Sequence, residues 1–142
     1  MIAVSVLGCL SSCSKKDSAP TGPAPTAGAV QEIEPNDGTP QNLGTLGTSD
    51  ITVSGTVNAF DVDKFSIALG ATVNLYASVG WQGSSDIDLG VMNQTGIMLS
   101  FQDSGAQPER CTLTARPAGV YIIQVTSKTS TATGYTLTIG SR

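Results

Sequence analysis

The chain has 142 residues, of which 39% are hydrophobic and 13% charged, and 11 acids against 7 bases give a net charge of −4. This length allows one ordinary domain with a tail, and the acidic balance excludes a nucleic-acid partner, which would require a basic surface. The sequence contains no histidine, which removes the commonest general base and most zinc chemistry. We therefore expect a protein with no catalytic residues.

The first 13 residues, MIAVSVLGCLSSC, form an apolar run that ends in small residues and cysteine. This segment resembles the end of a bacterial lipoprotein signal peptide, in which a cysteine becomes the lipid-carrying amino terminus. LSSC fits that pattern better than VLGC, so lipidation is predicted at Cys13, with Cys9 as the alternative. No Lys or Arg precedes the run, so a signal would need a start upstream of Met1. The competing interpretation is a buried or disordered apolar leader.

Residues 14–30 are rich in Pro, Ser, Ala, Gly and Thr. Such a composition cannot build a core, and it predicts a flexible, semi-extended tether. The apolar run before it is too short to be a transmembrane helix, which needs about 20 residues. The organisation predicted is a signal segment at 1–13, a tether at 14–30 and one domain at 31–142.

The domain shows short segments in which apolar and polar residues alternate with a period of two, which is typical of strands with one buried face. Turn sequences containing Gly, Pro, Asn or Asp separate these segments, and no helical periodicity lasts for three turns. The predicted strands are 51–57, 64–69, 72–79, 87–91, 97–101, 111–115, 121–125 and 135–139. This predicts an all-β fold, an antiparallel jelly-roll-like sandwich of about eight strands. Cys111 alternates with Leu113 and is expected to face the core as a small hydrophobe.

Five segments together resemble the bacterial pre-peptidase C-terminal domain, over roughly residues 31–140. They are EIEPNDGTPQNLG, VSGTVNAFDVDKFSI, SSDIDLGVMNQTG, RPAGVYIIQVTS and GYTLTIG, in that order. The resemblance implies a jelly-roll-like β-sandwich of secreted and surface bacterial proteins, which often follows a hydrolase domain. It also implies that some members bind calcium or extracellular polymers such as collagen.

In calcium-binding members of the family, acids and an asparagine of the opening segment surround the ion together with aspartates after the next strand. Carried over to this sequence, the ligands implied are Glu32, Glu34, Asn36, Asp37, Asp61 and Asp63. One family aspartate corresponds to Phe60 here, and Asp61 stands one position further along.

Charge repulsion argues for an ion independently of the family. Five of the chain's 11 acids, namely Glu32, Glu34, Asp37, Asp61 and Asp63, fall in two short segments. Carboxylates brought together oppose folding unless a cation joins them, and calcium accepts six to eight oxygens in loose geometry. The alternative is that EPND is only a turn with solvated acids.

Two other features of the sequence are candidate sites. Asp86 and Asp88 are two apart in SSDIDLG, and such a pair is expected to project into solvent beside a turn rather than to act in a glycosidase. Trp81, the single tryptophan, falls in a predicted loop, where it could contact a sugar or a peptide or could cap the core.

These observations predict a non-catalytic, lipid-anchored accessory module of the bacterial cell envelope, periplasmic or surface-exposed. Its partner would be a surface or extracellular protein or polysaccharide, with calcium as the cofactor and the membrane reached through the lipid. The alternative is a purely structural domain that stabilises an envelope complex and binds no ligand of its own.

Overall fold

The computed structural model describes residues 29–142, so the predicted signal segment, Cys9, Cys13 and nearly all of the predicted tether lie outside the described residues. The described part contains ten strands and no helix. The strands are β1 (Val30–Gln31), β2 (Gln41–Leu46), β3 (Ile51–Val57), β4 (Val62–Leu69), β5 (Val73–Trp81), β6 (Ile87–Asn93), β7 (Met98–Gln102), β8 (Glu109–Arg116), β9 (Gly119–Ser127) and β10 (Thr133–Ser141). Within residues 29–142 no helix is therefore available to span a membrane.

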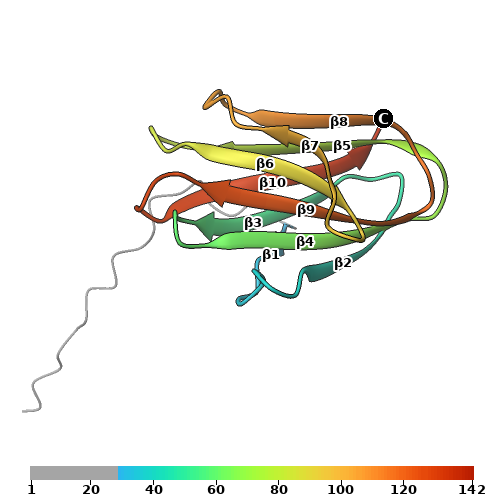
Figure 1. The fold of residues 1–142 in the computed structure, drawn as a ribbon, viewed down its shortest axis with the longest axis horizontal. Coiled ribbons are helices and arrows are strands. Elements are labelled where there is room, and N and C mark those ends of the chain that lie inside the picture. The colour runs from blue at the N-terminus through green and yellow to red at the C-terminus, as the bar shows by residue number, and fades with distance from the viewer. Residues whose placement is uncertain (1–28) are drawn as a thin grey trace, which may run out of the picture.

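The strands form two five-stranded sheets that pack face to face (Figure 1). The first sheet has the order β1-β3-β10-β5-β8 and the second has the order β2-β4-β9-β6-β7. Neighbours pair antiparallel except at one edge of each sheet, where β1 runs parallel to β3 and β2 runs parallel to β4. The predicted β-sandwich is confirmed, and the parallel edge pairs add a feature that the sequence did not predict.

The eight predicted strands correspond to β3 through β10, with ends that differ by a few residues. The strands that the sequence analysis missed are β1, which has two residues, and β2, whose sequence QNLGTL is interrupted by Gly44 at a positive φ of 83°. The pairing of β2 with β4 shifts register between Asn42 and Thr45, next to this glycine. Both strands take their conformation from the neighbour they pair with, so local periodicity cannot reveal them.

The core lies between the sheets and is built from the apolar positions of the alternating strands. On β4, for example, Phe65, Ile67 and Leu69 are buried while the residues between them are half-buried. Cys111 is buried as expected, its S–H donates to the Leu89 carbonyl at 3.6 Å, and burial raises the pKa of its thiol. Burial of this apolar surface is the main source of stability of the fold.

Candidate metal centre

Glu32 leaves the edge of the first sheet and turns its carboxylate inward. Its backbone N–H still continues the β1–β3 pairing by donating to the Ser54 carbonyl at 3.0 Å. Its Oε2 accepts the Thr56 N–H at 2.8 Å, and its Oε1 accepts the Tyr135 hydroxyl at 3.2 Å. The carboxylate therefore joins three segments: the amino-terminal edge, β3 and β10.

Gly55, which has no side chain, leaves the space in which the Glu32 carboxylate and the Tyr135 hydroxyl meet. A Cβ at position 55 would lie 2.5 Å from the Tyr135 hydroxyl oxygen and 2.6 Å from Glu32 Oε2. Real side chains do not approach so closely, so glycine is required for Glu32 and Tyr135 to meet under β3. The requirement is one of close approach rather than of backbone conformation.

Asn36 fixes the segment that follows. Its side chain is buried; Oδ1 accepts the Lys64 N–H at 3.0 Å, and Nδ2 donates to Glu32 Oε1 at 3.2 Å. The Lys64 ammonium in turn donates to the Asp37 carbonyl at 2.5 Å. Asn36 stays a predicted ion ligand; its amide oxygen accepts the backbone N–H of Lys64 on β4 and its amide nitrogen donates to Glu32, so it also positions the acids around it.

Asp63 is the most unusual residue of the group. It faces inward from β4, its exposed fraction is 0%, and neither carboxylate oxygen has a described residue in good hydrogen-bond geometry, although the Tyr135 hydroxyl lies near enough to oppose the rise of its pKa in part. Burial, followed by the neighbouring Glu32 carboxylate, raises the pKa of Asp63 to about 10. A buried carboxyl with no donor is costly in either charge state, and a proton or a cation at this point would lower that cost.

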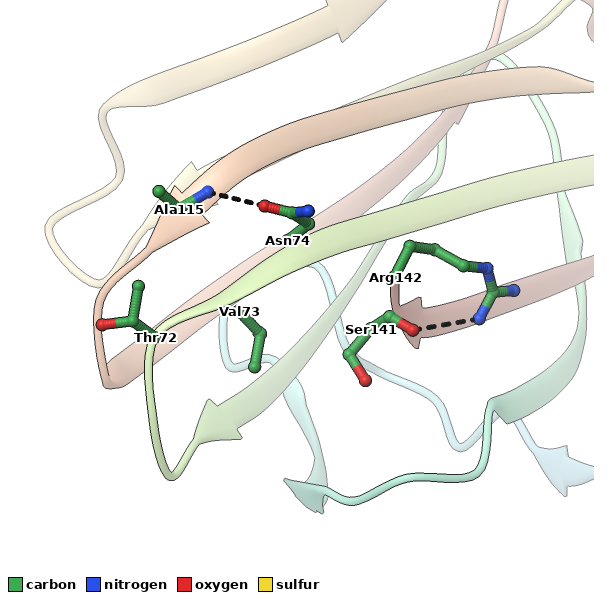
Figure 2. Close-up of a pocket in the computed structure, with 6 residues that line it drawn as sticks. All are labelled: Thr72, Val73, Asn74, Ala115, Ser141 and Arg142. Atoms are coloured by element: carbon green, nitrogen blue, oxygen red, sulfur yellow. Dashed lines mark hydrogen bonds between the residues drawn. The ribbon is translucent and has the colours of Figure 1, made fainter.

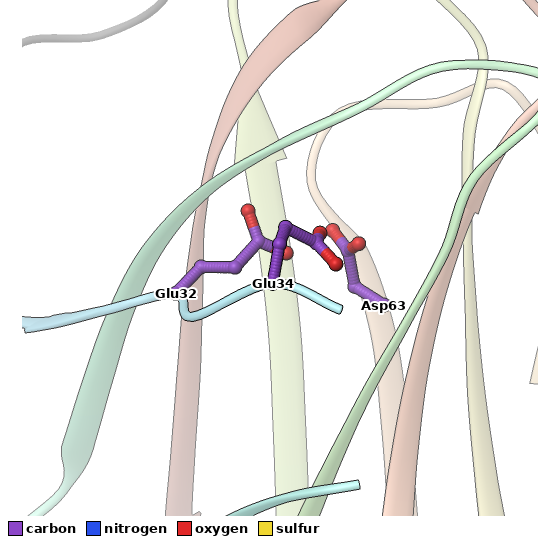
Figure 3. A group of neighbouring side chains, drawn as sticks. All are labelled: Glu32, Glu34 and Asp63. Carbon is purple, nitrogen blue, oxygen red and sulfur yellow. The ribbon is translucent and has the colours of Figure 1, made fainter. Parts of the chain in front are cut away.

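The acids assemble into two groups of three. Glu32, Glu34 and Asp63 each offer one oxygen, and these oxygens lie within 4.8 Å of one another (Figure 3). Glu34, Asp37 and Asp61 form a second group with the same spacing. Figure 3 shows the three carboxylates of the first group converging, two from the amino-terminal segment and one from β4.

The pKa shifts of the acids show that the two groups influence each other. The pKa of Glu34 is raised by burial and, more weakly, by Glu32, Asp61 and Asp37, against a lowering hydrogen bond from the Asn36 N–H. The pKa of Asp61 is raised by burial and by the charges of Asp37 and Glu32. Asp61 therefore joins the cluster although it stands one position away from the family aspartate. Phe60, at that position, is 87% exposed.

The pair Asp86 and Asp88 is arranged differently from what the sequence predicted. Lys128 lies between them, with its ammonium 3.3 Å from Asp86 Oδ2 and 3.2 Å from Asp88 Oδ1. Asp88 is buried rather than projecting into solvent, and burial raises its pKa in spite of the lysine. An ammonium already fills the position that a second cation would take, so this pair is a structural ion pair. No sequence signal links Lys128 to it.

Trp81 is not in a loop, contrary to the prediction. It is the last residue of β5, its exposed fraction is 5%, and its Nε1–H donates to the Ser85 carbonyl at 2.7 Å. A ring enclosed in this way has no face for a ligand. Trp81 therefore packs as part of the core, which is the second of the two roles expected for it.

No protein-family model and no curated protein matches the sequence. Among solved structures, the chain is similar to the pre-peptidase C-terminal domain of a collagenase from Bacillus anthracis, with a TM-score of 0.57 and 15% identity over 70% of this chain and 92% of the other. It is also similar to a mitogen from Yersinia pseudotuberculosis, with a TM-score of 0.54 and 14% identity over 68% of this chain and 88% of the other. At these identities the likeness concerns the fold alone. Residues 29–142 thus share the β-sandwich fold of the pre-peptidase C-terminal domain.

Proposed function

We propose that this protein is a non-catalytic binding or accessory module of the pre-peptidase C-terminal type, whose amino-terminal edge is closed by a calcium ion. The observation that carries the calcium site is Asp63, a fully buried carboxylate without a hydrogen-bond donor among the described residues, placed within 4.8 Å of Glu32 and Glu34 oxygens. A cation at this point would satisfy the orphaned oxygens and cancel the repulsion among the acids.

The donor set fits calcium better than other metals. Every candidate ligand in the two groups is a carboxylate, and hard oxygen ligands from two separate segments suit the flexible coordination of calcium. Magnesium demands a tighter octahedron, and zinc prefers nitrogen or sulfur ligands. Glu32, Glu34 and Asp63 would hold the ion, and Asp37 and Asp61 would complete its charge balance or hold a second one.

Calcium titration of the mature chain by isothermal calorimetry tests the site. We expect saturable binding with a dissociation constant of about 0.1 to 1 mM, in the range of extracellular calcium modules. Magnesium should bind more weakly, and Asp63→Asn should abolish the heat. A matched control is Asp103→Asn, which removes the same charge from an exposed turn. Equal heats for the wild type and Asp63→Asn would contradict the proposal.

The absence of catalysis is part of the same proposal. It rests on a sequence without histidine and on acid groups that are either clustered for a cation or, at Asp86 and Asp88, neutralised by Lys128. Such a module would act by binding an envelope or extracellular protein or polysaccharide, with a purely structural role in an envelope complex as the alternative.

We place the module at the bacterial cell envelope, held by a lipid on Cys13. The basis is the apolar run, the LSSC segment and the Pro-rich stretch after it. Mass spectrometry of the membrane fraction should find a mature chain that begins at a lipidated Cys13. A chain beginning at Cys9 would move the anchor, whereas an unmodified Met1 in the soluble fraction would contradict it.

A further inference from the structure

Two large apolar side chains flank the candidate metal centre and point into solvent. Phe60 is 87% exposed and Ile33 is 66% exposed. Ile33 stands between Glu32 and Glu34, and Phe60 directly precedes Asp61. Because Glu34 and Asp61 contribute oxygens to one group within 4.8 Å, the two apolar residues lie on adjoining segments. Large apolar side chains gathered at one end of a domain indicate an interaction surface.

The backbone on both segments is held by hydrogen bonds within the domain. The Phe60 N–H donates to Asn58 Oδ1 at 2.8 Å, and the Asp61 N–H donates to the Asn58 carbonyl at 3.1 Å, which closes the turn between β3 and β4. The Ile33 N–H donates to Gln41 Oε1 at 2.8 Å. A partner that contacts these side chains would therefore not have to order the segments that carry them, which lowers the cost of binding.

The acids between these apolar residues lie partly at the surface. Glu34 and Asp37 are exposed and Asp61 is half-buried, and each offers one oxygen to the second group. An ion held by these oxygens would keep several of calcium's six to eight coordination positions open toward the outside. The buried Asp63, whose oxygens lack a donor in good geometry among the described residues, supports an ion at this centre separately from the surface acids. An outside ligand with anionic oxygens could complete the coordination.

The two ends of the sandwich differ in charge. The acids of the metal centre gather at one end, with the Lys64 ammonium beside them. The opposite end, where β10 finishes, carries a hollow of about 420 Å³ (Figure 2), and there Arg142 is already paired with Asp50 at 2.8 Å. Without an ion, the clustered acids repel an anionic surface over about 8 to 10 Å. Because an ion reduces this repulsion, contact between the acidic end and an anionic surface should depend on calcium.

The chain that precedes the sandwich joins it close to this acidic end. Residue 29 leads into β1, which runs parallel to β3 and so heads toward the turn that carries Phe60. If a lipid is attached at Cys13, a chain of about 16 residues connects it to residue 29 and spans at most about 55 Å. A membrane would thus always lie within reach of the module. Even a weak contact is populated under these conditions, because tethering raises the effective concentration of its partner.

We propose that the acidic end of the sandwich docks on an anionic lipid membrane in the presence of calcium. Phe60 and Ile33 enter the headgroup region, and the surface acids share the ion with the phosphate oxygens of the lipid. Projecting side chains suit a bilayer, which needs no matching pocket, better than they suit a folded protein. This inference rests on the proposed function, since it requires the calcium site, and it adds a partner for that site.

Co-sedimentation with vesicles tests the proposal, using the mature chain from Cys13 produced without its lipid. We expect binding to mixed phosphatidylglycerol–phosphatidylcholine vesicles in millimolar calcium, and binding at least roughly 10-fold weaker in chelator or on pure phosphatidylcholine. Phe60→Ser should lower the partition coefficient in calcium about 10-fold, as expected for the loss of one buried aromatic side chain. Ile33→Ser should act in the same direction.

The matched control is Phe101→Ser, which removes another exposed phenylalanine, from β7. It should bind the vesicles like the wild type, and circular dichroism should show all variants folded. Equal weakening by Phe60→Ser and Phe101→Ser, or equal binding with and without calcium, would overturn the proposal. Calorimetry separates it from the proposed metal centre. Calcium binding without vesicle binding would overturn the docking alone, whereas a wild type that binds neither calcium nor vesicles would overturn both.

Discussion

Asp63→Asn should stabilise the calcium-free protein at neutral pH and abolish its stabilisation by calcium. Without an ion, a buried carboxyl among other acids must either stay protonated or hold an unpaired charge, and asparagine avoids both. We expect the unfolding free energy in chelator to rise by roughly 1 to 3 kcal/mol, the typical penalty of a buried polar group without partners. The new amide can also donate to Glu32 and Glu34, which are the nearest members of its group.

Calcium should partly offset the advantage in unfolding free energy that Asp63→Asn has over the wild type in chelator. At about 1 mM free ion and a dissociation constant near 0.1 mM, mass action adds about 1.4 kcal/mol to the stability of the wild type. For a domain of this size that raises the melting temperature by several degrees. Thermal melts of both proteins in chelator and in calcium provide the measurement, with Asp103→Asn as the control that responds like the wild type. A variant that gains as much from calcium as the wild type does would contradict the assignment of Asp63.

The stability of the calcium-free protein should increase as the pH falls from neutral toward 5. The folded pKa of Asp63 is raised from 3.8 to about 10, so between these values the folded protein keeps a proton that the unfolded chain has released. The unfolding free energy therefore falls as pH rises through this window, by up to about 1.4 kcal/mol per pH unit, and the contribution is fully present only below the lower value. Glu34, Asp61 and Asp88, whose pKa values are also raised by burial, act in the same direction.

Urea unfolding in chelator at pH 5, 6 and 7 measures this slope. Asp63→Asn should flatten most of it, because the largest contributor is gone. Saturating calcium should flatten it as well, since an ion replaces the proton. Asp50, whose pKa is lowered by Arg142, stabilises the fold by a constant amount above its ordinary value of 3.8 and loses this contribution only at lower pH, so the slope in this window is unaffected. A wild-type stability that rises between pH 5 and pH 7 in chelator would contradict the protonated state of Asp63.

Much of the fold could be predicted because it depends on local alternation. In β4 and β9 buried and less buried residues alternate with a period of two, β5 and β10 follow the same period over part of their length, and the turns between strands carry Gly, Pro, Asn or Asp. β1 and β2 could not be found in this way, since they are strands only through parallel pairing with residues more than 20 positions away. Pairing of that kind is set by the assembled core and not by the segment itself.

The candidate site, too, could be predicted from the sequence only in part. The acids of EIEPND and DVD were expected to meet, and the structure brings them within coordination distance of one another. What residue type alone could not tell is which oxygens already have a partner: the Asn36 amide oxygen accepts the Lys64 N–H, whereas the Asp63 oxygens have no donor in good geometry among the described residues. The ion pair of Asp88 with Lys128 escaped prediction for the same reason, because 40 positions of sequence separate its partners and only the folded sheet joins them.

The parallel pairing of β1 with β3 has a mechanical consequence for a chain that is pulled from its amino-terminal side. Tension at Val30 acts along the axis of β1, so the hydrogen bonds to β3 bear the load together instead of opening one after another. Next to these bonds, the Glu32 carboxylate accepts hydrogen bonds from Thr56 and Tyr135. A divalent ion shared by Glu32 and Asp63 would add a cross-link to β4. The force needed to shear this edge from the sandwich would then rise with the calcium concentration.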